Sequence, residues 1–283
     1  MGKRKRISGA RKRFPVVSIA FLLLGCLIVL VPVLWMVITS LKTVVETFAI
    51  PPTLLPKSFN ITAYKTVLTD YSFGTYFKNS TIVVCSATAL TLVVATLAGF
   101  GVSRFNFKGV GAFLGFILVT QMFPSVIMLV PYFRILRAYG LINKYMGLIL
   151  VYISFQTPLC TWLMYGYFKS IPRELDDAAS IDGLGKFKTF LLIIFPLCLP
   201  GLAATAIYAF INSWNEFQFA LVLTTSEKMK TVSIGIGQMI EDTKVNWNEM
   251  MAASLLASIP LILVFLFFQK YFFAGLTAGS VKQ

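Results

Sequence analysis

The sequence predicts an all-α integral membrane protein with six transmembrane helices and with both termini in the cytoplasm. Of the 283 residues, 57% are apolar and only 13% are charged, which is far from the composition of a soluble domain. Six stretches have no Asp, Glu, Lys or Arg, and each reaches the roughly 20 residues that a helix needs to cross the hydrocarbon core. They are residues 14–41, 79–103, 109–133, 145–168, 189–215 and 250–269. Because lipid cannot satisfy backbone hydrogen bonds, these stretches are expected to be helices and not open strands.

Lysine and arginine residues predict which side of the membrane each end occupies. Seven of them fall within the first 13 residues, and such residues are usually retained on the cytoplasmic side. Six crossings then return the C-terminus to the cytoplasm. The expected organisation is a basic cytoplasmic segment, residues 1–14, a six-helix transmembrane domain, residues 15–273, and a cytoplasmic tail, residues 274–283. The basic run could also be a nucleic-acid patch, but a hydrophobic span follows at once and nothing else in the sequence favours such a partner.

The segment after the first span, roughly residues 43–76, is predicted to lie on the outer side of the membrane. Three prolines between residues 51 and 56 disfavour a long helix there, so we expect an ordered but irregular segment. The second and third spans are expected over about 77–101 and 110–132. Pro124 and Pro131 would kink the third span and free carbonyl groups beside it. We interpret this as a structural kink, with a role in a substrate path as the alternative.

A polar loop over residues 168–192, after a fourth span at about 145–167, has the features of a short capped helix. Pro172 suits the first position of a helix, and Gly183 and Gly185 would end it after roughly ten residues. The first turn carries three carboxylates that complement the helix dipole, namely Glu174, Asp176 and Asp177. A helix this short is marginal alone in water and needs a partner, but this chain offers no soluble domain. The alternative, a helix lying on the lipid headgroups, is disfavoured because its carboxylates would face an anionic leaflet.

A second amphipathic piece is expected to follow this short helix. Its apolar side is predicted to contain Phe187, Phe190, Leu191 and Ile194. It would run through a stiff elbow at Pro196 into the fifth span, at about 192–215. The sixth span is expected at about 250–269, after an outer loop.

The fifth span runs into a polar cluster beside an acidic residue at the membrane edge. Its candidate residues are Asn212, Trp214, Asn215, Glu216 and Gln218. Proteins bind sugars through hydrogen bonds to the hydroxyl groups and through stacking on an aromatic ring, so this cluster is a candidate for a substrate pathway. A belt of interfacial Trp with a polar helix end explains the same residues equally well, and both interpretations stay open.

No catalytic, metal-binding or cofactor-binding residues are predicted. The chain has no His, the commonest metal ligand and general base, and its four cysteines lie far apart within apolar spans. No charged residue lies deep within a span, which disfavours a proton-driven carrier. The segment 183–186 resembles part of a P-loop, but Ser180 replaces its first glycine and Phe187 replaces the residue that would hold magnesium. We therefore expect that the chain is not an enzyme, and that energy for uphill transport comes from a separate subunit.

The polar loop resembles the EAA signature of ATP-binding-cassette importer permeases. The resemblance rests on Asp177, Ala178 and Ala179, then Gly183, then Ile193, Phe195 and Pro196. Asp177 stands where Glu is usual and Phe195 where Leu is usual, so the charge and the apolar character are kept. The resemblance also includes residues 76–80, 100–105 and 121–124. Residues 214–217 and the tail 275–282 narrow it to the carbohydrate-uptake branch, where the chain is similar to the second permease subunit of the maltose-transporter type.

The resemblance implies a multi-pass protein of the bacterial cytoplasmic (inner) membrane with the type I importer permease fold. A substrate-binding protein outside this membrane would deliver a sugar, expected to be an oligosaccharide, to this subunit and to a homologous second permease. Two ATPase subunits would bind ATP and Mg, and this chain would bind no cofactor. The loop helix, residues 174–185, would sit in a cleft of the ATPase, where Ala178 and Ala179 permit close approach and Gly183 ends the helix.

Two alternatives remain open at this point. A permease of the same architecture could carry glycerol phosphate or a glycerophosphodiester, for which Arg134, Arg137 and Lys144 would supply a cationic outer site. A membrane channel or scaffold without an ATPase belongs to a different class. Co-purification of an ATPase would distinguish that class from an importer.

Overall fold

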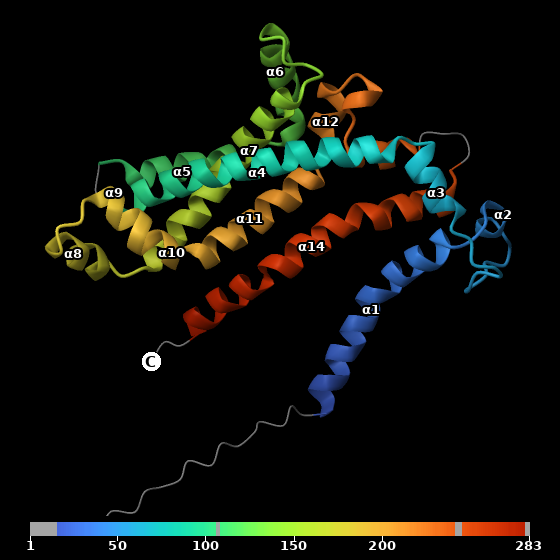
Figure 1. Cartoon of the computed structure of the whole chain (residues 1–283), viewed down its shortest axis with the longest axis horizontal. Coiled ribbons are helices and arrows are strands. Elements are labelled where there is room, and N and C mark those ends of the chain that lie inside the picture. The colour runs from blue at the N-terminus through green and yellow to red at the C-terminus, as the bar shows by residue number, and fades with distance from the viewer. Residues whose placement is uncertain (1–15, 106–107, 241–244, 281–283) are drawn as a thin grey trace, which may run out of the picture.

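The structure, a computed structural model, describes residues 16–105, 108–240 and 245–280. Within these ranges every regular element is a helix (Figure 1). The α-helices are α1 (Val16–Ser40), α2 (Val44–Thr47), α3 (Thr62–Thr69), α4 (Phe73–Arg104), α5 (Val110–Thr120), α6 (Ser125–Ala138), α7 (Tyr145–Ser170), α8 (Glu174–Ile181), α9 (Lys186–Thr189), α10 (Phe195–Leu197), α11 (Leu199–Trp214), α12 (Gln218–Leu223), α13 (Val232–Gln238) and α14 (Trp247–Ser280). A π-helical turn spans Phe190–Ile194 and a 3₁₀ turn spans Glu227–Met229.

Candidate membrane spans account for most of these helices. Among the described residues, the helices α1, α4, α7 and α14 are each long and apolar enough to cross a bilayer without a break. The pair α5 and α6 and the segment from α9 through α11 qualify as two further spans if each bent pair is counted as one. The predicted all-α class with several apolar spans is therefore confirmed. The count of six and the cytoplasmic location of the termini stay predictions, and the basic residues 1–14 lie outside the described ranges.

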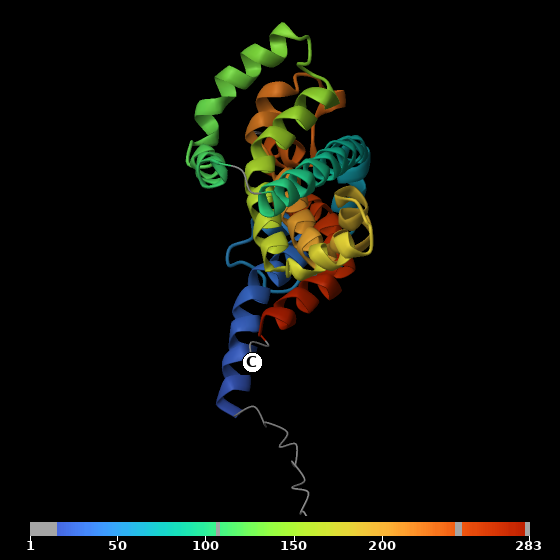
Figure 2. The ribbon, with the colours of Figure 1, turned by 90° about the vertical axis from the view of Figure 1, so that its left-hand side faces the viewer.

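The third predicted span is broken and not merely kinked. The chain bends by 94° between α5 and α6. Figure 2 shows this sharp change of direction between the two helices. Pro124 explains the position of the break, because a proline has no amide hydrogen and its ring clashes with the carbonyl four residues earlier. That carbonyl belongs to Thr120, the last residue of α5. Pro131 lies within α6, which continues past it to Ala138.

The fifth span bends by 73° between Leu197 and Leu199, close to the predicted elbow at Pro196. The π-helical turn precedes Pro196, and Pro200 lies in the first turn of α11. Pro200 cannot donate a hydrogen bond to the carbonyl of Pro196, so the helical ladder is interrupted at this point. Two prolines, Pro196 and Pro200, thus flank the bend, and only Pro196 was predicted from the sequence to mark it.

The segment between α1 and α4 matches its predicted structure, whereas the last helix is longer than predicted. The short helices α2 and α3 are separated by irregular backbone, so the prediction of no long helix there is confirmed. Helix α14 continues to Ser280, well past the predicted end of the sixth span near residue 269. The segment expected to be a tail is thus helical up to residue 280.

Helices α4 and α7 form the centre of the molecule, and α11 packs beside both (Figure 1). One buried cluster joins all three helices to the π-helical turn, through Cys160, Met164, Phe168 and Ile194 among others. Helix α1 packs against α14, and its apolar side chains between residues 19 and 34 are exposed. In a membrane such a surface is covered by lipid or by another subunit.

The close approach of α4 and α7 depends on Gly99. A Cβ atom at this position would lie 2.9 Å from both the Met164 Cβ and the Tyr165 backbone nitrogen. We therefore expect Gly99→Ala to destabilise the fold by about 1–3 kcal/mol, despite the better helix propensity of alanine. The matched control is Gly101→Ala, where a Cβ meets nothing within 4 Å and a gain of up to about 1 kcal/mol is expected. Thermal unfolding in detergent should show shifts of opposite sign, and a gain at Gly99 would contradict the packing argument.

Candidate functional site

Helix α8 lies at one end of the molecule, between the end of α7 and α9 (Figure 1). It begins at Glu174, with Arg173 as its N-cap residue, so Pro172 precedes the helix and does not occupy its first position. The three expected carboxylates do lie in the first turn, where they favour the helix dipole.

One of these carboxylates ties α8 to the end of α4. The Asp176 carboxylate lies 3.2 Å from the Arg104 guanidinium, and the Arg104 side chain is only 7% exposed. Arg104 also donates to the Ile171 carbonyl at 3.1 Å, and Arg173 donates in the opposite direction to the Ser103 carbonyl at 3.0 Å. Asp176 therefore anchors the helix to the chain, whereas Glu174 and Asp177 are exposed.

The end of α8 has the hydrogen bonds of a Schellman motif. The Gly183 amide donates to the Ser180 carbonyl at 3.1 Å, and the Leu184 amide donates to the Ala179 carbonyl at 2.9 Å. Gly183 has a φ of +77°, which glycine adopts without steric cost. The predicted helix stop at Gly183 is confirmed, and Gly185 then begins α9 in an extended conformation.

The two alanines of α8 face different ways. Ala178 is exposed, whereas Ala179 is 1% exposed and belongs to the packing beneath the helix. The outward face carries apolar side chains instead: Ile181 is 87% exposed and Leu175 is 36% exposed. The sequence analysis missed these two residues, although Leu175, Ala178 and Ile181 are spaced by three and share one helix face.

The amphipathic piece after α8 buries only part of its predicted apolar side. Phe190 and Ile194 are buried, but Phe187 and Leu191 are exposed. Phe187 lies in α9. A cavity of about 190 Å³ lies between this loop and the end of α4. Lys186 places its Nζ atom 4.7 Å from the centre of the Phe105 ring beside it.

The polar cluster after α11 is only partly available to a ligand. Asn212, Asn215 and Gln218 are exposed. Trp214 is 4% exposed, stacks on Phe210 with a centroid distance of 5.7 Å, and donates from its indole nitrogen to the Ala257 carbonyl at 3.0 Å. A Trp that stacks on a sugar must expose at least one face of its ring, so we assign the buried Trp214 to packing in this conformation.

The Glu216 side chain, two residues before the start of α12, caps the first turn of that helix. Its carboxylate accepts hydrogen bonds from the Phe219 amide at 2.7 Å, the Ala220 amide at 3.0 Å and the Tyr152 hydroxyl at 2.8 Å. These bonds satisfy amide groups that a helix leaves unpaired at its first turn. Glu216 thereby positions Gln218, the first residue of α12.

The structure adds a residue that the sequence analysis did not connect with this cluster. The Ser125 hydroxyl, at the start of α6, donates to the Gln218 side-chain carbonyl at 2.9 Å. Gln121, in the break before α6, donates to the Phe155 carbonyl at 3.1 Å. The break between α5 and α6 thus places Ser125 beside Gln218 of α12 and Gln121 against the backbone of α7. No local sequence signal links residues that are separated by more than ninety positions.

Residues 91–277 match the family described as "Binding-protein-dependent transport system inner membrane component". The chain belongs to this family. It is 37% identical over 271 residues to the trehalose/maltose transport system permease protein MalG of Thermococcus litoralis, covering 92% of this chain and 94% of that protein. It is 34% identical over 253 residues to the sulfoquinovosyl glycerol transport system permease protein SmoH of Agrobacterium fabrum, covering 89% of each. A solved bacterial ABC transporter involved in import of the acidic polysaccharide alginate contains a chain of the same fold. The TM-score is 0.75 at 23% identity, covering 91% of this chain and 95% of that one.

The comparisons settle several predictions made from the sequence. The resemblance to sugar-importer permeases of ABC transporters is confirmed. As a member of this family with several apolar helices, the chain is a multi-pass protein of the inner membrane. Its relatives are transport subunits, so a channel or scaffold is not favoured. The relative MalG is named for the transport of trehalose and maltose, so a carrier of glycerol phosphate or glycerophosphodiesters is not favoured either. Arg134, Arg137 and Lys144, which that last alternative needs, are all exposed.

Proposed function

We propose that this chain is the permease subunit of an ATP-driven, binding-protein-dependent importer that carries a sugar, and specifically an oligosaccharide. The observation that carries the proposal is the family match over residues 91–277, which is supported by relatives whose names specify sugar-containing cargo. The exposed helix α8, in the position of the EAA signature, supports an energy source outside this chain.

The proposed topology has six crossings and cytoplasmic termini. The transmembrane permease domain is residues 15–273, flanked by the basic segment 1–14 and the tail 274–283. In this arrangement α8 and the rest of the loop 168–192 lie in the cytoplasm, and the segments around α2, α3 and α13 lie outside. Seven basic residues at the N-terminus support this orientation, because such residues are retained on the cytoplasmic side.

We assign to α8 the role of a coupling helix that docks in a surface cleft of an ATPase subunit. Leu175, Ala178 and Ile181 support this role, because an apolar face on a cytoplasmic helix needs a partner. Asp176 and Gly183 would act indirectly, by holding the helix on α4 and by ending it. Pro196 would help to fix the bend that joins the loop to α11.

The proposed partners follow from the same architecture. A homologous second permease would complete the translocation pathway, two ATPase subunits would bind ATP and Mg, and an extracytoplasmic binding protein would deliver the sugar. Among residues 16–105, 108–240 and 245–280, no group of three His, Cys, Asp or Glu side chains could hold a metal ion.

The test is purification of the chain from its native membrane in mild detergent, with the companions identified by mass spectrometry. A second permease and an ATPase should co-purify, and a binding protein loaded with one member of a sugar panel should stimulate ATP hydrolysis. Purification of the chain without any ATPase would contradict the proposal.

The proposed substrate pathway includes Asn212, Asn215 and Gln218, with Ser125 beside them. We expect Gln218→Ala to raise the KM for sugar uptake several-fold, because a hydrogen bond to a neutral group contributes about 0.5–1.5 kcal/mol. Gln269→Ala is a suitable control, since Gln269 lies far from α12 in the sequence, is half-buried, and donates to the Leu266 carbonyl of its own helix at 3.2 Å. An unchanged KM in both variants would remove Gln218 from the pathway.

A further inference from the structure

Helix α4 is the stiffest of the candidate spans. It runs without a break for 32 residues, which corresponds to about 48 Å. It contains no proline, whereas α1, α7 and α14 contain Pro32, Pro158 and Pro260, and the two bent spans are interrupted at prolines. Prolines are the usual sites of helix kinks, so α4 is the span that moves most nearly as one body.

The inner end of α4 is fastened to the coupling helix in both directions. Arg104 reaches from α4 to Asp176 of α8 and to the Ile171 carbonyl, and Arg173 reaches back to the Ser103 carbonyl of α4. An ion pair with one partner almost fully buried is screened less by solvent than an exposed ion pair.

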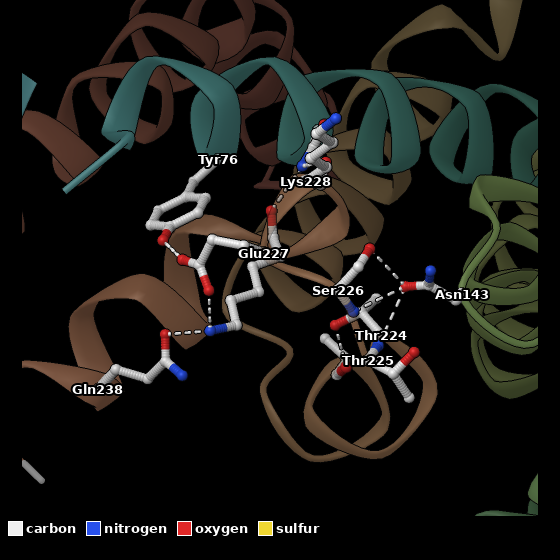
Figure 3. Close-up of polar contacts among 11 residues, drawn as sticks. Tyr76, Asn143, Thr224, Thr225, Ser226, Glu227, Lys228 and Gln238 are labelled. Atoms are coloured by element: carbon white, nitrogen blue, oxygen red, sulfur yellow. Dashed lines mark hydrogen bonds and ion pairs between the residues drawn. The ribbon is translucent and has the colours of Figure 1, made fainter.

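The outer end of α4 is fastened to the loop over residues 224–231 between α12 and α13. Asn79 is 1% exposed, and its amide nitrogen donates to the Lys228 carbonyl at 2.9 Å and the Lys230 carbonyl at 2.7 Å. The Tyr76 hydroxyl donates to the Glu227 carboxylate, as Figure 3 shows. Ser80 accepts a hydrogen bond from the Val232 amide at 2.9 Å.

The loop 224–231 is also held by hydrogen bonds to Asn143 and to Gln238, which Figure 3 shows. The Asn143 side-chain carbonyl accepts from the Thr225 and Ser226 amides, each at 3.0 Å. Lys230 pairs with Glu227 and donates to the Gln238 side-chain carbonyl at 2.8 Å. Because of these contacts, a displacement of this loop would move the outer end of α4 with it, without being lost in local changes of the loop backbone.

We propose that α4 transmits movement between the loop 224–231 on the outer side and the coupling helix α8, with Asn79 and Arg104 as the positioning residues at its two ends. The inference rests on the proposed function, in which the binding protein engages the outer side and α8 docks on the ATPase. Docking of the loaded binding protein would shift the loop, and the stiff helix would carry the shift to the surface that contacts the ATPase. Two sites at opposite ends of one packed element can be coupled in this way.

The experiment uses the complete importer in proteoliposomes and measures how many-fold the loaded binding protein stimulates ATP hydrolysis. Asn79→Ala removes both bonds to the loop, and we expect stimulation to fall about tenfold while basal hydrolysis stays within about twofold. Tyr76→Phe keeps the ring and its packing, so it is a second variant for which a partial loss of stimulation is expected. The control is Thr81→Ala, at the same end of α4, where the hydroxyl is exposed and bonds only to the Phe77 carbonyl of its own helix.

A double variant separates transmission from a merely structural role. If Asn79 and Arg104 act through one element, Asn79→Ala combined with Arg104→Gln should reduce stimulation no further than the more severe single change. Multiplicative losses, or wild-type stimulation in both Asn79→Ala and Tyr76→Phe, would overturn the inference. A wild-type complex that holds no ATPase would instead overturn the proposed function, and this inference with it.

Discussion

Replacing Ile181 with arginine is expected to release the ATPase from the complex and to abolish sugar uptake. Ile181 is 87% exposed on α8. In the proposed complex this apolar side chain would be buried in the cleft of the ATPase subunit, where such side chains contribute most of the binding free energy. An arginine would bury an unpaired charge in that cleft, and the loss of about 2–4 kcal/mol corresponds to an affinity roughly 30- to 1,000-fold weaker. The measurement is the amount of ATPase recovered with the chain, together with uptake.

The matched control for Ile181→Arg is Val45→Arg. Val45 is 83% exposed on the short helix α2, which lies at the end of the molecule away from α8 (Figure 1). The same substitution there should leave the recovered ATPase at the wild-type level. Equal recovery of the ATPase with Ile181→Arg and with the wild-type chain would exclude the outward face of α8 as the docking surface.

Replacing Glu216 with alanine is expected to destabilise the chain and to impair transport together. The change leaves the Phe219 amide, the Ala220 amide and the Tyr152 hydroxyl without their acceptor. Each unsatisfied buried group costs about 1–3 kcal/mol, so a total of about 3 kcal/mol or more is expected. Thermal unfolding of the purified complex measures the loss, and Glu216→Gln, which keeps one acceptor oxygen, should lose less.

Asn212→Ala is the comparison for stability. Asn212 is exposed and donates to the Tyr208 carbonyl of its own helix at 2.9 Å, so its removal should leave the unfolding temperature nearly unchanged. If Glu216→Ala unfolds at the temperature of Asn212→Ala, the capping role of Glu216 is wrong. If Glu216→Ala is destabilised but transports normally, then the position of α12 does not matter for the pathway.

The class of the protein and the location of its most specific loop were predictable from the order of its amino acids. Long uncharged stretches predict spans because the cost of charge in lipid is local to each residue. The end of α8 at Gly183 was predictable for a similar reason, since a left-handed residue after a helix depends on the chain next to it. These predictions need no knowledge of which helices are neighbours.

Which side chains are exposed and available to a partner or substrate became visible only in the folded chain. Ala178 and Ala179 are adjacent in one motif, yet Ala178 is exposed and Ala179 is buried. They differ because only one face of α8 packs against the rest of the protein. The sequence makes Trp214 a candidate contact for the sugar, but its ring is buried and stacked on Phe210. The contacts of Ser125 with Gln218, and of Asn79 with the loop near Lys228, join residues far apart in the chain. The burial of a side chain and its hydrogen-bond partners depend on which residues pack against it. The hydropathy of the sequence does not identify those residues.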